Sequence, residues 1–327
     1  MPNPTSPSYL EQAIFNTVRY FALFSLPVTA TQIWRSLVIP PATTQLRWDG
    51  HALYSLSAVQ QALTTSVWLK QHLETEWGYY CLPGERLLVR ERLWRHTISQ
   101  DKWKIVSRAA KLLSAVPFVR SLSVAGSVAQ DNAKVTSDLD MFVIARHGRI
   151  WTARLLLLAV TQLLGRRRRH WDEQAPDKVC LNHYITDESL LMTPEIRTVF
   201  TAVEYTHHVP LTGHALYRSF HATNDGWFKR FLMYPEAPAL ASTHAVATGH
   251  VSNFIKKILE SILLEPLGTR LERWAEAVQR RSIARHTEPN QSGRVVVSPR
   301  ELAFHPHSKV EGLLQRFTQD AGQQALL

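Results

Sequence analysis

The sequence predicts an α+β fold, with a small mixed sheet between a helical N-terminal module and a mainly helical C-terminal region. Short apolar segments alternate with a helical segment between residues 119 and 185, which indicates strands and a helix packed together. Helical spacing of apolar residues precedes and follows this stretch. The chain has 327 residues, which is enough for about two or three domains. We therefore expect three parts, at residues 1–84, 85–190 and 191–327.

In the first part, residues 1–84, the sequence predicts helices followed by a hairpin. Apolar residues recur at helical spacing in three segments, Tyr9–Phe24, Gln32–Val38 and Ala58–Lys70. Thr29 or Thr31 is expected to cap the second helix, and Ser57 the third. Residues 73–84 alternate around Gly78, which is typical of a short hairpin.

Three helices followed by a hairpin is the order of a winged helix, a fold whose third helix commonly enters the major groove of DNA. The third predicted helix carries only one basic residue, Lys70, and phosphate contacts need several. A winged-helix-like module that makes protein contacts or packs internally is therefore as good an interpretation as one that binds DNA.

The second part predicts a long helix and then the sheet. Residues 85–117 are helical and basic, with one apolar face formed by Ile105, Ala109, Leu112 and Leu113. The expected core elements are strand Val119–Val124, strand Asp138–Ala145, helix Arg149–Leu164 and strand Val179–Ile185.

The third part predicts mainly helices. The expected elements are a helix from Pro194 to Val203 or beyond, one or two helices in His250–Arg285 interrupted at Pro266–Gly268, a short strand in Gly293–Ser298, and a last helix at Lys309–Thr318. Phe254, Ile258, Ile262 and Leu263 have helical spacing.

Charge and composition limit the partners. The net charge of +10 favours an anionic partner such as nucleic acid, a nucleotide or a membrane surface. Cys81 and Cys180 form neither a disulfide framework nor a zinc spacing, which fits a reducing cytoplasm. Met1–Ser8 does not resemble a signal peptide, and the apolar run Ile150–Leu164 is shorter than the ~20 residues that span a bilayer. We expect a cytoplasmic protein without a membrane partner, and the oligomeric state stays open.

The most informative stretch runs from Val124 to Ala145. An apolar strand ends at Gly126 and Ser127, and after a spacer of about ten residues Asp138 and Asp140 begin the next strand. Alternate residues of a strand point to one face, so the two carboxylates project side by side. Two adjacent anions on an apolar strand need a cation, and Mg²⁺ or Mn²⁺ suits oxygen ligands. An edge strand with solvated aspartates is the other interpretation, but the residues that follow are continuously apolar.

This arrangement resembles the polymerase-β-like nucleotidyltransferase superfamily, whose pattern is an apolar residue, Gly, Gly or Ser, a spacer, and Asp-apolar-Asp-apolar. The resemblance covers about 25 residues directly and, by element order, residues 104–190. It implies that Asp138 and Asp140 are catalytic metal ligands and that Gly126 and Ser127 contact a nucleoside triphosphate. By their positions, we expect Lys134 and Arg154 to add cationic contacts to the nucleotide.

Active members of that superfamily usually carry a third carboxylate on the next core strand. The corresponding strand here offers Asn182, followed by His183, and no acid. An asparagine keeps an oxygen ligand for the metal but cannot act as a general base. Four nearby acids could substitute only if the fold places them beside the pair: Asp172, Glu173, Asp177 and Asp187. Otherwise Asn182 and His183 are a capping residue and an exposed histidine at a strand end.

The arginine run Arg166–Arg169 has two interpretations, a solvated helix end or an electrostatic contact for triphosphate or nucleic acid. Three functions remain open. The first is a metal-dependent nucleotidyltransferase that moves a nucleoside monophosphate from a triphosphate onto a hydroxyl acceptor. The second is a catalytically impaired protein of the same fold that binds nucleotide, RNA or DNA through its basic surface. The third is a winged-helix DNA-binding regulator.

Overall fold

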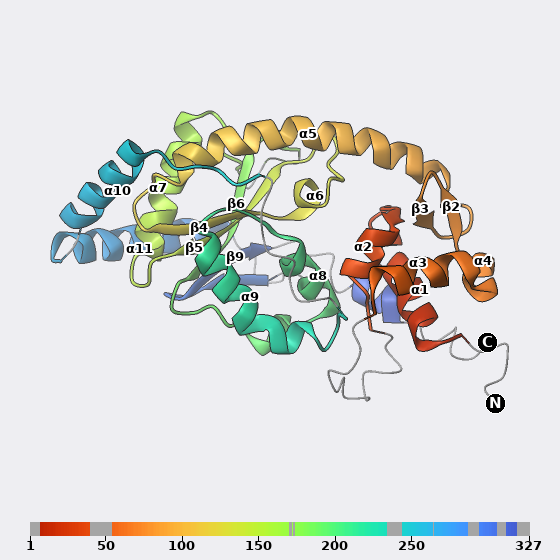
Figure 1. The fold of residues 1–327 in the computed structure, drawn as a ribbon. Helices are drawn as coiled ribbons and strands as arrows, with labels where there is room; N and C mark the ends of the chain where they lie inside the picture. The colour runs from red at the N-terminus through yellow and green to blue at the C-terminus, as the bar shows by residue number, and fades with distance from the viewer. Residues whose placement is uncertain are drawn as a thin grey trace.

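The computed structural model describes residues 7–39, 54–169, 172, 174–233, 244–263, 265–286, 294–305 and 312–318. The expected α+β fold is confirmed, with a six-stranded mixed sheet and a separate three-stranded antiparallel sheet. The larger sheet lies at the centre of the molecule, the N-terminal helices lie at one end, and helices α10 and α11 lie at the other (Figure 1).

The six-stranded sheet has the order β7-β4-β5-β6-β9-β8. Its strands are β4 (Val119–Val124), β5 (Leu139–Ala145), β6 (Val179–Thr186), β7 (Val209–Thr212), β8 (Arg294–Val297) and β9 (Glu301–His305). Among the described strands of this sheet, β5 and β6 pair in parallel and the other neighbours pair antiparallel. The sequence predicted β4, β5, β6 and β8 but missed β7 and β9, which pair at either side of the predicted three-strand core.

The N-terminal module consists of short helices followed by a β-hairpin, as expected, but its described residues form four helices rather than three. Its elements are α1 (Tyr9–Ala22), β1 (Val28–Thr29), α2 (Ala30–Arg35), α3 (Leu56–Thr65), α4 (Val67–His72), β2 (Glu74–Glu76) and β3 (Tyr79–Cys81). Thr29 caps α2, as one of the two expected caps. The prediction of a single third helix was wrong, because Ser66 ends α3 and caps a separate helix, α4. The predicted cap was also wrong, since Ser55 rather than Ser57 caps α3. Trp77 and Gly78 both have positive φ, as a tight hairpin turn requires.

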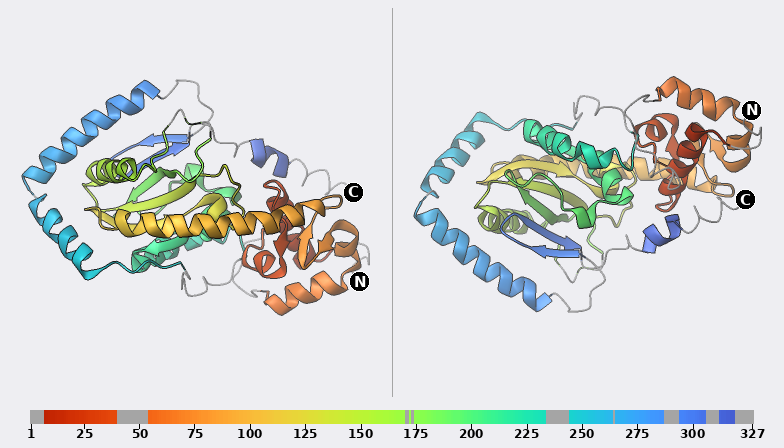
Figure 2. Two further views of the ribbon diagram at one scale, coloured as in Figure 1. Left: turned by 90° about the horizontal axis from the view of Figure 1, so that it is seen from above. Right: turned by 90° about the horizontal axis from the view of Figure 1, so that it is seen from below.

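Helices α5 (Leu87–Leu113) and α7 (Ile150–Leu163) pack on one face of the large sheet. Figure 2 shows α5 extending along the sheet to the N-terminal module. The predicted apolar face of α5 needs one correction: Leu112 is exposed, and Val106, Ala110 and Leu113 are buried with Ala109. This face of the sheet is lined by alternate β5 residues, including Leu139 and Met141.

Helices α8 (Val199–His207) and α9 (His214–Phe228) pack on the opposite face. A short 3₁₀ turn at Pro194–Ile196 precedes α8, so the helix expected from Pro194 begins later. One continuous apolar core contains Phe142 of β5, residues of α8 and α9, and most of the buried residues of α1. The N-terminal module is therefore packed directly against the elements that cover this side of the sheet.

The C-terminal region contains α10 (His250–Ile262) and α11 (Leu267–His286), and the break between them ends at Pro266, so that Leu267 and Gly268 of the predicted interruption lie within α11. Residues 312–318 are helical, and residues 309–311 of the predicted last helix lie outside the described residues. Among the helices that the structure describes, none has the length and apolar character that crossing a membrane requires.

Candidate functional site

The glycine turn after β4 lies directly against an acidic side chain. Gly126 begins the short helix α6 (Gly126–Ala129) with φ +63°, a conformation that glycine adopts without strain. A Cβ added at Gly126 would lie 2.7 Å from Oδ2 of Asp140. A larger residue would therefore have to displace the carboxylate, and the turn and the acid form one structural unit.

A serine pair closes the loop between α6 and β5. Ser127 Oγ donates a hydrogen bond to Ser137 Oγ at 3.3 Å, and the backbone N–H of Lys134 donates to the same Ser137 oxygen at 2.9 Å. Ser127 is thus held next to the start of β5. The side chain of Lys134 is exposed, on the loop that leads into the site.

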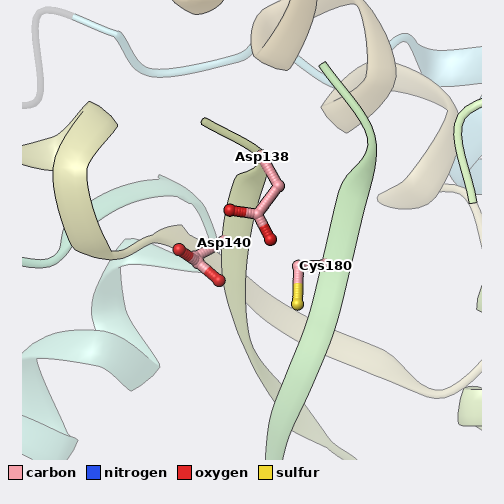
Figure 3. A group of neighbouring side chains, drawn as sticks. All are labelled: Asp138, Asp140 and Cys180. Atoms are coloured by element: carbon pink, nitrogen blue, oxygen red, sulfur yellow. The ribbon is translucent and has the colours of Figure 1, made fainter. Parts of the chain in front are cut away.

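Two aspartates and a cysteine form a compact cluster at the start of β5 and β6. Asp138, Asp140 and Cys180 each offer one ligand atom, and these atoms lie within 4.8 Å of one another. Figure 3 shows the two aspartates on one strand and Cys180 on the neighbouring strand of the sheet. The parallel register aligns Asp140 with Cys180. Cys180 was not predicted as a site residue, although strand alternation places it on the same face as Asn182.

A β-bulge between β5 and β6 brings Asn182 to the same site. Asp140 is aligned with Cys180 but Phe142 with His183, so β6 has one extra residue between these pairs. Asn182 Nδ2 donates to Oδ1 of Asp140 at 3.3 Å. The alternative of a capping asparagine and an exposed histidine is therefore wrong. Asn182 faces the aspartates from mid-strand, and His183 is buried and pairs with Glu301 at 3.0 Å.

Arg168 supplies a positive charge to the cluster. Its Nη1 donates a hydrogen bond to Oδ2 of Asp138 and a longer one, 3.7 Å, to the sulfur of Cys180. The interpretation of the whole arginine run as a solvated helix end is therefore wrong for this residue. The run gives no periodicity that could have singled out Arg168, because it lies between α7 and β6 rather than on either element.

Burial and neighbouring acids raise the pKa of Asp140 to about 7. The largest cause is burial, and the negative charges of Asp138 and Glu204 act in the same direction. Glu204 lies on α8, and burial raises its pKa to about 7 as well. The pKa of the Cys180 thiol is raised well above its usual value, chiefly by burial and then by the two aspartates. The site therefore concentrates acidic groups that a bound cation would stabilise.

Arg154 is directed to other partners. Its Nη1 donates to Oε1 of Gln279 at 2.5 Å, and its guanidinium lies 4.6 Å from the ring centre of Phe304. Burial lowers its pKa. None of its hydrogen bonds within the described part of the chain reaches an aspartate of the site, so the structure does not bring it together with Asp138 and Asp140.

The acids considered as substitutes for a third carboxylate also have other partners. Asp177 pairs with Lys102 at 2.7 Å, Asp187 accepts from the backbone of His147 at 2.7 Å, and Asp172 accepts from the backbone of Arg169 at 2.9 Å. Glu173 lies outside the described residues. Glu204, whose charge acts on Asp140, was missed because a residue on a distant helix leaves no spacing signal in the sequence.

The side chains fit a hard divalent cation. Mg²⁺ is commonly held by one or two carboxylates together with substrate phosphates, and Asp138 and Asp140 provide such a pair next to a glycine turn. The third member of the cluster is a thiol whose raised pKa keeps it protonated, so it is a poor ligand for Mg²⁺. Comparisons with known protein families, curated proteins and solved structures found no match to this chain.

Proposed function

We propose that this protein is a metal-dependent nucleotidyltransferase of the polymerase-β-like superfamily. It transfers a nucleoside monophosphate from a nucleoside triphosphate to a hydroxyl acceptor. The observation that carries the proposal is the contact between the glycine turn and the acid, where a Cβ at Gly126 would lie 2.7 Å from Asp140. A phosphate-binding turn and a metal-binding carboxylate in direct contact serve a substrate that carries both groups, a metal-bound triphosphate.

Each residue of the site has a role in this proposal. Asp138 and Asp140 would hold Mg²⁺ or Mn²⁺, which would supply charge neutralisation at phosphorus and activation of the attacking hydroxyl. Gly126 and Ser127 lie at the start of α6, and the first backbone N–H groups of a helix, which have no partner within the helix, can bind phosphate oxygens. Arg168, which neutralises Asp138 without nucleotide, supplies a cation to the triphosphate.

A second function, nucleotide binding without turnover, is favoured by the composition of β6. Cys180 and Asn182 stand opposite the aspartates where a third acid would act as a general base. Neither a protonated thiol nor an amide accepts a proton from the acceptor hydroxyl. In this alternative the protein binds the metal–nucleotide complex, or RNA or DNA through its basic surface, and does not release pyrophosphate.

The third function, a DNA-binding regulator, has less support. Helix α3 contains no basic residue, and Lys70 and His72 are on the separate helix α4. The module also shares one apolar core with α8 and α9. An internal packing role explains both observations.

The test is to incubate the purified chain with each of the four ribonucleoside triphosphates and Mg²⁺ or Mn²⁺, with and without RNA or cell extract. Pyrophosphate release that disappears in Asp138→Asn supports transfer. Metal-dependent triphosphate binding without pyrophosphate release, measured by calorimetry, supports the second function. Absence of both binding and release contradicts the nucleotide site altogether.

A further inference from the structure

Helix α10 is amphipathic, but its orientation is the reverse of that of an ordinary surface helix. A surface helix normally turns its apolar face to the core and its polar face to solvent. In α10 the polar residues Lys256 and Glu260 contact the body of the protein, and none of the helix residues is fully buried. The helix lies at the end of the molecule opposite the N-terminal module (Figure 1).

The polar face of α10 is attached by charged groups. Glu260 accepts a two-pronged contact from Arg120, at 2.8 and 3.0 Å, and a hydrogen bond from the backbone N–H of Phe118 at 2.7 Å. Lys256, one turn earlier, donates to the carbonyl oxygen of Ser114 at 2.9 Å. These contacts fix which side of the helix faces the sheet.

The apolar residues of α10 lie on the opposite side and are exposed. They recur at positions i, i+3, i+4, i+7, i+8 and i+11, which form one stripe along a helix. The exposed fractions are 72% for Val251, 64% for Phe254, 50% for Ile255, 43% for Ile258, 39% for Leu259 and 58% for Ile262. A stripe of this kind on a folded protein marks an interaction surface.

Charge near the stripe indicates an anionic partner. Lys257 on α10 and Arg270 and Arg273 at the start of α11 are exposed. Two neighbouring acids are paired with arginines, Glu260 with Arg120 and Glu265 with Arg149 at 3.1 Å. Glu272 is turned inward and accepts hydrogen bonds from the backbone of Trp151 and Thr152. The net charge available to a partner is therefore positive along the stripe, as it is for the whole chain.

Charge argues against a second copy of the chain. Helix α11 also exposes apolar side chains, with exposed fractions of 57% for Leu267, 55% for Trp274 and 40% for Val278. Pairing two copies through this end of the molecule would bring like charges together, because the exposed cations there are the same on both copies.

We propose that α10 binds to the surface of an anionic lipid bilayer, with the stripe Val251–Ile262 in the interfacial region and Lys257 and the nearby arginines against the headgroups. An amphipathic helix lying in the bilayer surface needs neither the length nor the continuous apolar sequence of a spanning helix. We expected no membrane partner because the sequence lacks a membrane-spanning segment. A helix that lies in the bilayer surface does not need such a segment. The polar face stays attached to the protein and orients it on the membrane.

The test is co-sedimentation of the full chain with vesicles of phosphatidylcholine alone and with vesicles of equal parts phosphatidylcholine and phosphatidylglycerol. The test variant carries Ile255→Glu and Ile258→Glu. Both side chains are already exposed, so folding is preserved, and circular dichroism checks it. The matched control is Leu87→Glu, the same change at a leucine that is 77% exposed on the first turn of α5, beside the N-terminal module.

We expect the wild-type chain and Leu87→Glu to bind the mixed vesicles and the double variant to bind them at least about tenfold more weakly. Wild-type binding to phosphatidylcholine alone should be much weaker. The proposal is overturned if the wild type does not bind the mixed vesicles, if it binds both vesicles equally, or if the double variant binds like the wild type. It is also overturned if sedimentation velocity shows a wild-type dimer that the double variant abolishes, because a second copy then covers the face.

Discussion

Strands β5 and β6 lie side by side at the site but contribute different side chains to it, acidic from β5 and uncharged from β6. Asp138 and Asp140 lie at the start of β5, both carboxylates directed to one cluster. The facing positions of β6 are Cys180 and Asn182, a protonated thiol and an amide. The two strands pair in parallel, but β5 contributes two carboxylates to the site and β6 contributes uncharged side chains.

The difference separates two tasks that a nucleotidyl-transfer site must perform. A pair of carboxylates is sufficient to hold a divalent cation and a triphosphate. Accepting a proton from the attacking hydroxyl needs a further basic group. We infer that β5 carries the binding task in full, and that the residues of β6 limit the rate of transfer.

The largest expected effect comes from removing the charge on β5. Asp138→Asn and Asp140→Asn each remove a metal ligand of the proposed site, so we expect pyrophosphate release to fall about a hundredfold or more. The matched control is Asp101→Asn, the same change at an exposed aspartate on α5 that pairs only with Lys104 among the described residues. Equal loss in the control, or no loss in the site variants, would show that Asp138 and Asp140 take no part in the reaction.

A gain is expected from adding charge to β6. Asn182→Asp places a carboxylate beside Asp140, where the amide nitrogen of Asn182 now lies 3.3 Å from Oδ1. With Mg²⁺ present, we expect the turnover rate to rise at least about tenfold, since a positioned general base typically contributes about a hundredfold or more. Cys180→Ser, which changes the facing residue without adding charge, should leave the rate unchanged. A rate that does not rise in Asn182→Asp would show that β6 does not limit transfer.

A smaller loss is expected at the turn that supports β5. Gly126→Ala introduces a Cβ 2.7 Å from the Asp140 carboxylate in a residue with positive φ. We expect triphosphate affinity, measured by calorimetry, to fall about tenfold, since both strain and displacement of the acid oppose binding. The control is Gly148→Ala, where φ is +70° and nothing lies within 4 Å of the added atom. If both variants bind equally well, contact between turn and acid has no role in binding.

A further effect, on stability rather than on activity, concerns the apolar continuation of the same strands. Beyond the site, Phe142 packs on His183 of β6 and on His208, with ring centres 5.0 and 5.2 Å apart. Burial lowers the pKa of His183 and lowers that of His208 well below its usual value. Both ring nitrogens of His208 are buried without a hydrogen-bond partner in the described part of the chain. The native state therefore keeps these histidines neutral.

These histidines make the native state less stable at low pH. The unfolded chain takes up protons on these histidines below about pH 6.5, but the native state does so only at lower pH. Stability is therefore full above about pH 6.5 and falls as the pH drops toward the lowered native values, by about 1.4 kcal/mol per histidine and pH unit. Urea unfolding at about pH 7 and about pH 5 measures this loss. In His208→Phe the loss should be smaller, and an unchanged loss would exclude His208 as a contributor.

Much of the site could be predicted from the sequence because its residues lie on elements with a clear period. Alternation along a strand put Asp138 and Asp140 on one face, and glycine chemistry indicated the turn. The same alternation would have identified Cys180 beside Asn182. Arg168 could not be predicted, because its position depends on how the chain connects α7 to β6.

The fold was predictable to a similar degree. The long helices and the central strands have strong periodicity, and their order is as expected. Strands β7 and β9 were missed because each is a short segment whose strand character comes from pairing with β4 or β6. The orientation of α10 could also not be predicted from the sequence. The spacing of Phe254 and Ile258 predicts an apolar face but does not say whether that face is covered.

The central claim is that Asp138 and Asp140 bind a divalent cation together with a triphosphate. The most direct measurement is electron paramagnetic resonance of Mn²⁺ titrated into the protein with and without a non-hydrolysable nucleoside triphosphate. We predict that the wild type binds Mn²⁺ more tightly when the triphosphate is present, and that Asp138→Asn and Asp140→Asn abolish this protein-bound signal. Binding in both variants that equals that of the wild type would contradict the account.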